Sequence, residues 1–190
     1  TNTITSTHDK QTVKACLNRC RIIVNHSNTA LLNVRNSPLI QLSKIAQTIH
    51  DKNVFDTQVH DCVEHAYESF IKMGCCVNLI QPDDLTPLMM AIMYRQYRHV
   101  KLLIRYKVDI NYVGATGTHH CLKLALQQYA RAIEYYNTQQ SFLNVDNVVR
   151  SSKCVKLLIM FGANVDYVDE NLAIAIQQIL HIRYSLNKSI

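Results

Sequence analysis

One short pattern, an apolar helical segment followed by a polar exit, occurs three times in this chain of 190 residues. It occupies residues 100–111 and 155–166 and, more faintly, residues 69–78. Asn78 and Asn111, which end two of these exits, lie 33 positions apart. A period of this length is the signature of a repeat architecture, in which each copy is one supersecondary unit. The repeat therefore favours a stack of copies of one unit.

Four helix openings accompany the exits. In the clearest, at residues 83–92, Thr86 is able to cap a helix and Pro87 stands at the first helical position. The other openings begin at residues 37, 121 and 171. The opening leucine and the exit lie 23 residues apart in the copy that contains Thr86, but 39 and 44 residues apart in the two neighbouring copies. We expect those two copies to carry insertions inside a helical hairpin.

The composition favours helices. The chain has only 4 Gly and 3 Pro, while 48% of its residues are apolar and 18% are charged. This balance excludes a disordered or collagen-like chain and is typical of helices joined by short connections. The apolar runs are far shorter than the roughly 18 residues that cross a bilayer, and residues 1–10 hold no apolar stretch typical of a secretory signal. The sequence predicts an all-α chain without a membrane span.

The cysteines and the net charge bear on the compartment and the partner. Seven cysteines, an odd number without a repeated Cys-x-x-Cys spacing, argue against a secreted disulfide framework and predict a cytoplasmic or nuclear location. The formal net charge is +6, but the 20 Lys and Arg are scattered rather than gathered in a run. Charge alone therefore does not define a nucleic-acid-binding protein.

The openings and exits resemble those of the ankyrin repeat family, whose unit of about 33 residues is a turn followed by two antiparallel helices. The Thr-Pro-Leu of residues 86–88, with Ala91, matches the family's opening, and the Gly-Ala-Asn-Val-Asp of residues 162–166 matches its exit. The copy at residues 83–113 matches the unit length without a gap. The resemblance implies a stack of such units.

Three positions depart from the family pattern. Met89 stands where the family carries His, Arg95 replaces the glycine between the two helices, and Lys107 replaces the glycine that ends the second helix. Glycine is usual at such helix ends because it adopts positive φ without steric cost. The sequence therefore predicts that Arg95 and Lys107 occupy turns that normally belong to glycine.

The resemblance implies an all-α ankyrin-repeat solenoid of helix-turn-helix units with a capping helix at each end. The expected divisions are an N-terminal capping helix and lead-in at 1–36, repeats at 37–80, 83–113 and 118–168, a partial repeat at 169–186, and a tail at 187–190.

Both insertions are expected to lengthen helices. In the third copy the apolar residues keep helical spacing from 120 to 136, so the insertion extends the first helix and the second helix lengthens to match. Asp146 or Asn147 is expected to cap that second helix. The inserted hairpins then have their tips at residues 50–57 and 139–146. Alternatively, the insertions have no function of their own and are extra residues that an exposed connection tolerates.

No enzyme motif is visible. The chain lacks a Gly-rich phosphate loop, a His-Glu-x-x-His run and a Gly-x-Ser-x-Gly run. Two clusters contain residues of types that bind zinc, but their spacing is a poor match to known zinc motifs. They are His119, His120 and Cys121, and His60, Cys62 and His65. Because His120 and Cys121 hold the Thr-Pro positions of an opening, a capping turn is the favoured interpretation. We expect no catalytic residue, no metal and no cofactor.

The remaining cysteine pairs are expected to serve packing. Cys16 and Cys20 share one helix face, and Cys75 and Cys76 stand at a helix exit where the family carries small residues. No redox role follows from this pattern.

The resemblance implies a non-enzymatic protein-interaction module, a scaffold or adaptor that binds a protein through its turn tips and first helices. Met89 is the better surface candidate on the first helix, while core and surface are about equally favoured for Met90 and Met93. A tyrosine follows two of the exits, as Tyr112 and Tyr167, and it serves either as an exposed anchor for a partner or in packing. The predicted partner-binding residues are Gln81, Asp83, Asp84, Leu85, Met89, Tyr94, Tyr112, Thr116, Thr118, Asp169 and Glu170.

The partner classes are left open. The resemblance implies signalling or ubiquitin-pathway proteins among them, and self-association stays open. A basic nucleic-acid-binding protein is the alternative function, although the scatter of the basic residues disfavours it. Its cations would be Lys101, Arg105, Lys107, Arg131, Arg150, Lys153 and Lys156, with ten tyrosines available for stacking. A metal-dependent or cysteine enzyme is a remote alternative, because no motif is organised for it.

Overall fold

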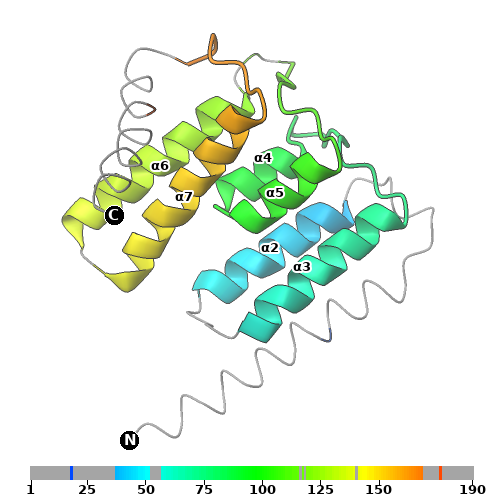
Figure 1. The fold of residues 1–190 in the computed structure, drawn as a ribbon, viewed down its shortest axis with the longest axis horizontal. Coiled ribbons are helices and arrows are strands. Elements are labelled where there is room, and N and C mark those ends of the chain that lie inside the picture. The colour runs from blue at the N-terminus through cyan, green and yellow to red at the C-terminus, as the bar shows by residue number, and fades with distance from the viewer. Residues whose placement is uncertain are drawn as a thin grey trace, which may run out of the picture. The chain divides into compact units, whose positions relative to one another are not determined.

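A computed structural model describes residues 37–51, 57–115, 117, 119–139 and 141–168, together with residues 18 and 176. This part of the chain contains six α-helices and one isolated β-bridge (Figure 1). The helices are α2 (Pro38–Asp51), α3 (Thr57–Lys72), α4 (Pro87–Met93), α5 (Tyr97–Arg105), α6 (Cys121–Thr138) and α7 (Phe142–Met160). The predicted all-α class is confirmed. None of the described helices is long and apolar enough to cross a membrane.

The chain divides into two compact units, Thr1–Met90 and Ala91–Ile190, with the boundary inside α4. In the first unit α2 packs against α3. In the second unit α6 packs against α7, and α5 packs against α7 as well. The predicted capping segments at 1–36 and 169–186 lie outside the described residues, apart from Asn18 and Ile176, which are helical.

The first helix of each copy begins after an equivalent buried residue. Ser37, Thr86 and His120 precede α2, α4 and α6, and all three are buried. The Thr86 hydroxyl accepts a hydrogen bond from the Met89 backbone N–H at 3.3 Å, and Pro87 is the first residue of α4. The cap and the helix start predicted from the sequence are confirmed, because Thr satisfies a free N–H and Pro has none to satisfy.

The repeated sequence produces a repeated core. Leu39, Leu88 and Leu122 occupy equivalent places in the three first helices, and each is fully buried. The second helices bury their own equivalent set, which consists of Phe70, Leu103 and Leu158. Full burial of such a side chain stabilises the fold by about 1.5–3 kcal/mol. Each of these three copies therefore buries a large apolar side chain at both positions.

The second helices also end in the same way. At the end of α7 the Gly162 N–H donates to the Ile159 carbonyl at 3.2 Å, and the Ala163 N–H donates to the Leu158 carbonyl at 2.9 Å. This pair of bonds is the Schellman motif, which needs a left-handed residue at the first donor. The same pair joins Gly74 to Ile71 and Cys75 to Phe70 after α3, and Lys107 to Ile104 and Val108 to Leu103 after α5. The three exits of the sequence pattern are one structural motif.

Arg95 and Lys107 adopt the conformation that the family gives to glycine. Their φ angles are 55° and 57°, and both lie at Schellman ends, of α4 and α5 respectively. A left-handed backbone costs a residue with a side chain roughly 1–2 kcal/mol. The prediction that side-chain-bearing residues occupy the glycine turns is confirmed.

The third copy is elongated as expected, but its hairpin tip differs from the prediction. α6 has 18 residues and α7 has 19, against 7 and 9 in α4 and α5. The N-cap of α7 is Ser141, whose hydroxyl accepts from the Asn144 N–H at 3.2 Å. The expectation that Asp146 or Asn147 caps this helix is wrong, because Ser141 offers an acceptor one turn earlier. The tip of the first inserted hairpin lies largely outside the described residues.

Two burial expectations also need correction. Met89 is 0% exposed, so its placement on the surface is wrong. It lies on the first turn of α4, directly after Leu88, and that turn is buried throughout. Cys75 is buried as expected, but Cys76 is exposed and does not pack. Met90 is buried and Met93 half-buried, which favours the core interpretation for Met90.

Candidate protein-interaction surface

The turn that leads into α4 is held by its own backbone. The Gln81 N–H donates to the Leu85 carbonyl at 2.9 Å, and the Asp84 N–H donates to the Gln81 carbonyl at 2.9 Å. Asp84 has a φ of 64°, a conformation that Asp tolerates better than most residues. Asp83 is exposed, while Gln81, Asp84 and Leu85 are half-buried. This turn presents a carboxylate at a fixed place on the first unit.

A second turn, at residues 113–120, leads into α6. Val113 and His120 form the antiparallel β-bridge, and the Gly114 N–H donates to the His119 carbonyl at 3.0 Å. Gly117 closes the turn with a φ of 68° and an N–H bond to the Gly114 carbonyl at 2.7 Å. The half-buried Tyr112 stands directly before the bridge. Thr116 and Thr118 lie outside the described residues.

Asn111 joins the exits of the second and third copies. Its side-chain amide donates to the Gly162 carbonyl at 3.0 Å, and its side-chain oxygen accepts from the Asn164 N–H at 2.7 Å. Asp109 fixes Asn111 in turn, because its carboxylate accepts from the Asn111 N–H at 3.0 Å. The sequence pattern marked Asn111 as an exit residue and missed this link between copies. The recurrence of Asn and Asp at alternate exit positions was the available signal.

Tyr167 stacks on His120, with ring centroids 4.6 Å apart and an interplanar angle of 28°. Both ring nitrogens of His120 are buried without a hydrogen-bond partner among the described residues. Burial lowers the pKa of His120, because the charged imidazole is poorly solvated there. Tyr167 itself is exposed on its outer side. It therefore combines the two roles that the sequence left open, packing and exposure.

Arg95 connects the second copy to both helices of the third. Its Nε donates to the Asn147 side-chain oxygen at 3.1 Å, and its Nη1 donates to the Gln128 side-chain oxygen at 3.0 Å. Gln128 is buried on α6, so this bond satisfies an acceptor that water does not reach freely. The sequence identified Arg95 only as a departure from glycine. Its bonding partners lie 33 and 52 residues away and carry no local signal.

The predicted partner-binding residues fall into separate groups. Gln81, Asp83, Asp84, Leu85 and the buried Met89 belong to the first unit, and Tyr94 and Tyr112 belong to the second. Tyr94 is half-buried in the turn between α4 and α5. Asp169 and Glu170 lie outside the described residues. In the turn of the first unit, Asp83 is exposed and the neighbouring Asp84 is half-buried.

The clusters with potential zinc ligands do not assemble. Across the described residues, no group of three or more His, Cys, Asp and Glu side chains is placed to hold a metal ion. Burial raises the pKa of Cys121 and of Cys154 to about 12, so both stay protonated thiols at neutral pH. A thiol is a poor nucleophile and a poor metal ligand compared with a thiolate. These two cysteines fit the apolar interior.

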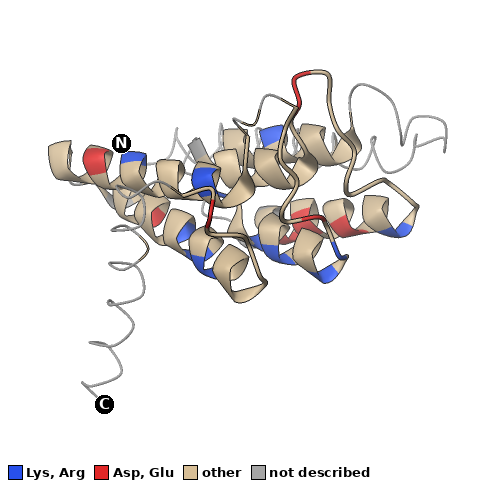
Figure 2. Cartoon of the chain, turned by 90° about the horizontal axis from the view of Figure 1, so that it is seen from above, with Lys and Arg blue, Asp and Glu red and all other residues tan. Residues whose placement is uncertain are grey.

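The candidate cations for nucleic acid spread over several elements, as the blue segments in Figure 2 illustrate. Lys101 and Arg105 are exposed on α5, Lys107 follows that helix, and Arg131 is exposed on α6. On α7, the Arg150 side chain donates to Asp146, while Lys153 is exposed and lies 4.5 Å from the centre of the Tyr97 ring. The cations therefore do not form a continuous track.

Comparison with known proteins agrees with the repeat. Residues 83–111 match the family model described as ankyrin repeat. A search of curated proteins and a search of solved structures each returned no match. The matched segment is the copy in which no insertion interrupts the hairpin, and the resemblance read from the sequence is confirmed there. Ankyrin repeats are in general protein-interaction modules, and the family is typically non-enzymatic.

Proposed function

We propose that this chain is a non-enzymatic scaffold or adaptor that binds a protein partner through its turn tips and first helices. The ankyrin repeat at residues 83–111 carries the proposal. Stacked units of this kind offer an extended surface made of successive turns and helices, without a need for catalytic groups. The partner classes implied by the resemblance, signalling and ubiquitin-pathway proteins, are part of the proposal.

The geometry of the turns supports this function. The turn at residues 113–120 is closed by a β-bridge, and Asn111 fastens the exit before it to the next exit. Turns that are ordered before binding lose little conformational entropy when a partner docks. The contact residues proposed are those of the sequence prediction without the buried Met89: Gln81, Asp83, Asp84, Leu85, Tyr94, Tyr112, Thr116, Thr118, Asp169 and Glu170.

The test is affinity capture from cell extract, followed by measurement of the identified partner's affinity. The variant carries Asp83→Lys and Tyr112→Ala. The matched control carries Asp61→Lys and Tyr135→Ala, which make the same kinds of change at exposed positions on α3 and α6. We expect the first variant to lose about tenfold or more in affinity, which corresponds to about 1.4 kcal/mol, and the control to bind as wild type. Equal affinity for all three proteins would show that the turns are not the binding surface.

A further inference from the structure

The second helices of the second unit carry positive charge that the proposed turn surface does not use. Residues 91–168 contain ten Lys and Arg against four Asp and Glu. α5 has no acidic residue, and the one acidic residue of α7, Asp146, accepts a hydrogen bond from Arg150. The outer side of α5 and α7 is therefore unbalanced in charge.

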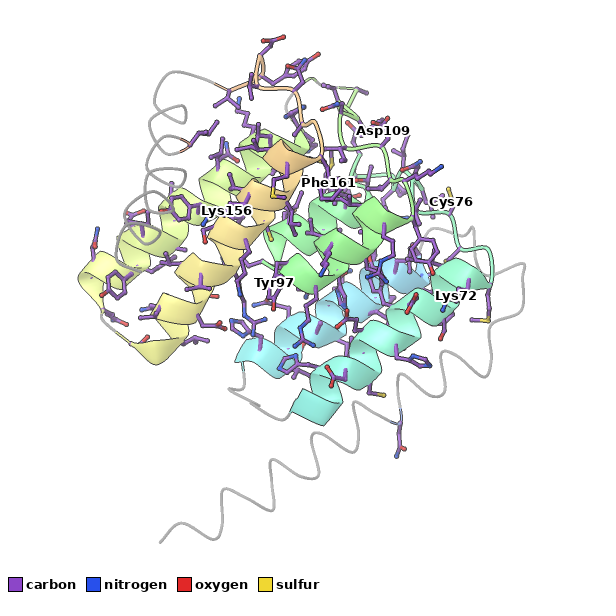
Figure 3. All side chains as sticks on the ribbon, in the orientation of Figure 1. Lys72, Cys76, Tyr97, Asp109, Lys156 and Phe161 are labelled. Carbon is purple, nitrogen blue, oxygen red and sulfur yellow. The ribbon has the colours of Figure 1, made fainter. Side chains whose placement is uncertain are left out.

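Three lysines lie on this outer side. α5, which carries Tyr97, and α7, which carries Lys156, run side by side (Figure 3). The Lys153 ammonium lies 4.5 Å from the centre of the Tyr97 ring. Lys101 is exposed on α5 four residues beyond Tyr97 and so shares its helix face, and the half-buried Lys156 stands three residues beyond Lys153 on α7. No ion pair joins Lys101, Lys153 or Lys156 to another residue that the structure describes. We name these three residues the lysine patch.

Exposed apolar side chains flank the lysine patch. Val149, Lys153, Lys156 and Met160 follow one another on α7 in steps of three and four residues, so they share one face of the helix. Val149 is 40% exposed and Met160 67% exposed, and Phe161, directly after the helix, is 55% exposed. Val149 precedes Lys153 and Met160 follows Lys156 on this face, so an exposed apolar side chain borders the two lysines of α7 at either end.

We propose that the lysine patch and its apolar border bind an acidic amphipathic segment of a partner protein. Such a segment supplies carboxylates to the three lysines and apolar side chains to Val149, Met160 and Phe161, which is charge and apolar complementarity at once. A nucleic acid fits less well, because its phosphate backbone gives the apolar border no contact and because tight electrostatic binding engages on the order of 6–10 phosphates. This second surface is separate in sequence from the turns at residues 81–85 and 113–120.

The test uses the full chain and a fluorescent synthetic helical peptide with glutamates along one edge and leucines beside them. The variant carries Lys101→Glu and Lys156→Glu and leaves Lys153 in contact with Tyr97. The matched control carries Lys123→Glu and Arg131→Glu on α6, which changes the net charge by the same amount. We expect the patch variant to bind the peptide about tenfold more weakly than wild type, or about 1.4 kcal/mol, and the control to lose less than twofold.

Further arms separate the apolar contribution and the other ligands. Met160→Gln is expected to weaken peptide binding without altering the helical circular dichroism, and a peptide with Gln in place of Glu should not bind. Equal losses in the patch variant and the control would overturn the proposal, because they would indicate nonspecific charge. Tighter binding of a single-stranded oligonucleotide or of anionic phospholipid vesicles than of the peptide, lost in the same variant, would also overturn it. Since none of these variants touches the turns, the result is independent of the turn surface.

Discussion

The copy at residues 83–113 and the copy at residues 118–168 begin and end alike but differ in their outer halves. Both start after a buried residue, Thr86 or His120, and both end in a Schellman motif. The helices of the first are 7 and 9 residues long, while those of the second are 18 and 19. We call the copy at residues 83–113 the compact copy and the copy at residues 118–168 the elongated copy. The family model matches the compact copy. What the two copies share is the base of the helical hairpin, where the first helix begins and the second helix ends.

The added length contributes helix without adding core. In α6 the last buried residue is Ala132, and in α7 the first buried residue is Ser151. Among the described residues between them, none is buried. This outer half is held by local bonds, such as those from the Asn144 amide to the carbonyls of Tyr135 and Gln139. An insertion at the hairpin tip is tolerated because it leaves the apolar base unchanged.

The largest expected effect is the difference in unfolding free energy between substitutions at the base and at the tip of the elongated copy. Leu158→Ala removes a fully buried side chain at the base and should lower the free energy of unfolding by about 2–5 kcal/mol. Tyr135→Ala, at a side chain 65% exposed near the tip, should cost about 0.5 kcal/mol or less. Urea denaturation followed by circular dichroism measures both. Similar losses at the two sites would mean that the outer half contributes to the core after all.

Substitution of Arg95 tests the hydrogen bonds that join the two copies. Arg95→Gly removes the strain of a left-handed backbone, which costs a residue with a side chain roughly 1–2 kcal/mol. It also removes the hydrogen bonds to Gln128 and Asn147, each of which stabilises the fold by about 1.5–3 kcal/mol. We expect a net loss of about 1–5 kcal/mol in unfolding free energy. A double-mutant cycle with Gln128→Ala isolates the bond to α6. A stabilised Arg95→Gly protein would argue that these bonds contribute little.

Lys107 is the matched position without such bonds. It is exposed, has a φ of 57°, and ends α5 inside the compact copy. Lys107→Gly should therefore raise the free energy of unfolding by about 0.5–1 kcal/mol, since the relief of strain exceeds the added entropy of the unfolded chain. The changes in unfolding free energy expected for Arg95→Gly and Lys107→Gly have opposite signs, and thermal or urea denaturation of both variants measures them together. A loss of stability in Lys107→Gly would reveal an unrecognised role for its side chain.

The opening residues predict a difference in pH dependence. Thr86 caps the compact copy with a hydroxyl, whereas His120 opens the elongated copy with a buried imidazole stacked on Tyr167. Burial lowers the pKa of His120 below its ordinary value of 6.5, so the unfolded chain takes up a proton at a higher pH than the folded chain does. This contribution to stability is present above pH 6.5 and is lost as the pH falls through the lowered pKa.

His120→Phe is the variant for this measurement, because it keeps an aromatic ring against Tyr167 and removes the titrating group. Unfolding free energies of wild type and variant, compared from pH 8 to pH 5, should diverge on the acid side, with the wild type losing more. Parallel pH profiles would show that His120 does not contribute to acid sensitivity.

Much of the local structure was predictable. The cap at Thr86, the helix start at Pro87 and the positive φ of Arg95 and Lys107 all follow from the register of one repeat. The elongation of α6 also followed, because its apolar residues keep helical spacing. These features depend on neighbours within a few residues, and such neighbours are visible in a sequence.

The wrong predictions have two other causes. The register alone predicts Met89 on the surface, yet the structure buries it. The sequence predicts Asp146 or Asn147 as the cap of α7, but Ser141 caps the helix earlier in the chain. The sequence also predicts that Cys76 packs, and it is exposed beside the buried Cys75. Burial depends on what packs over a residue from elsewhere in the chain, and several residue types can cap a helix equally well.

The sequence by itself determined the repeat, its helical class and the glycine-like turns, because helix periodicity, caps and left-handed ends are local properties of the chain. The tertiary structure alone decided that Arg95 bonds to Gln128 and Asn147, that Asn111 joins two exits, and that Lys153 lies over the Tyr97 ring. These contacts depend on which helix packs beside which. That choice is made by the burial of apolar surface across the whole unit, which no short stretch of sequence specifies.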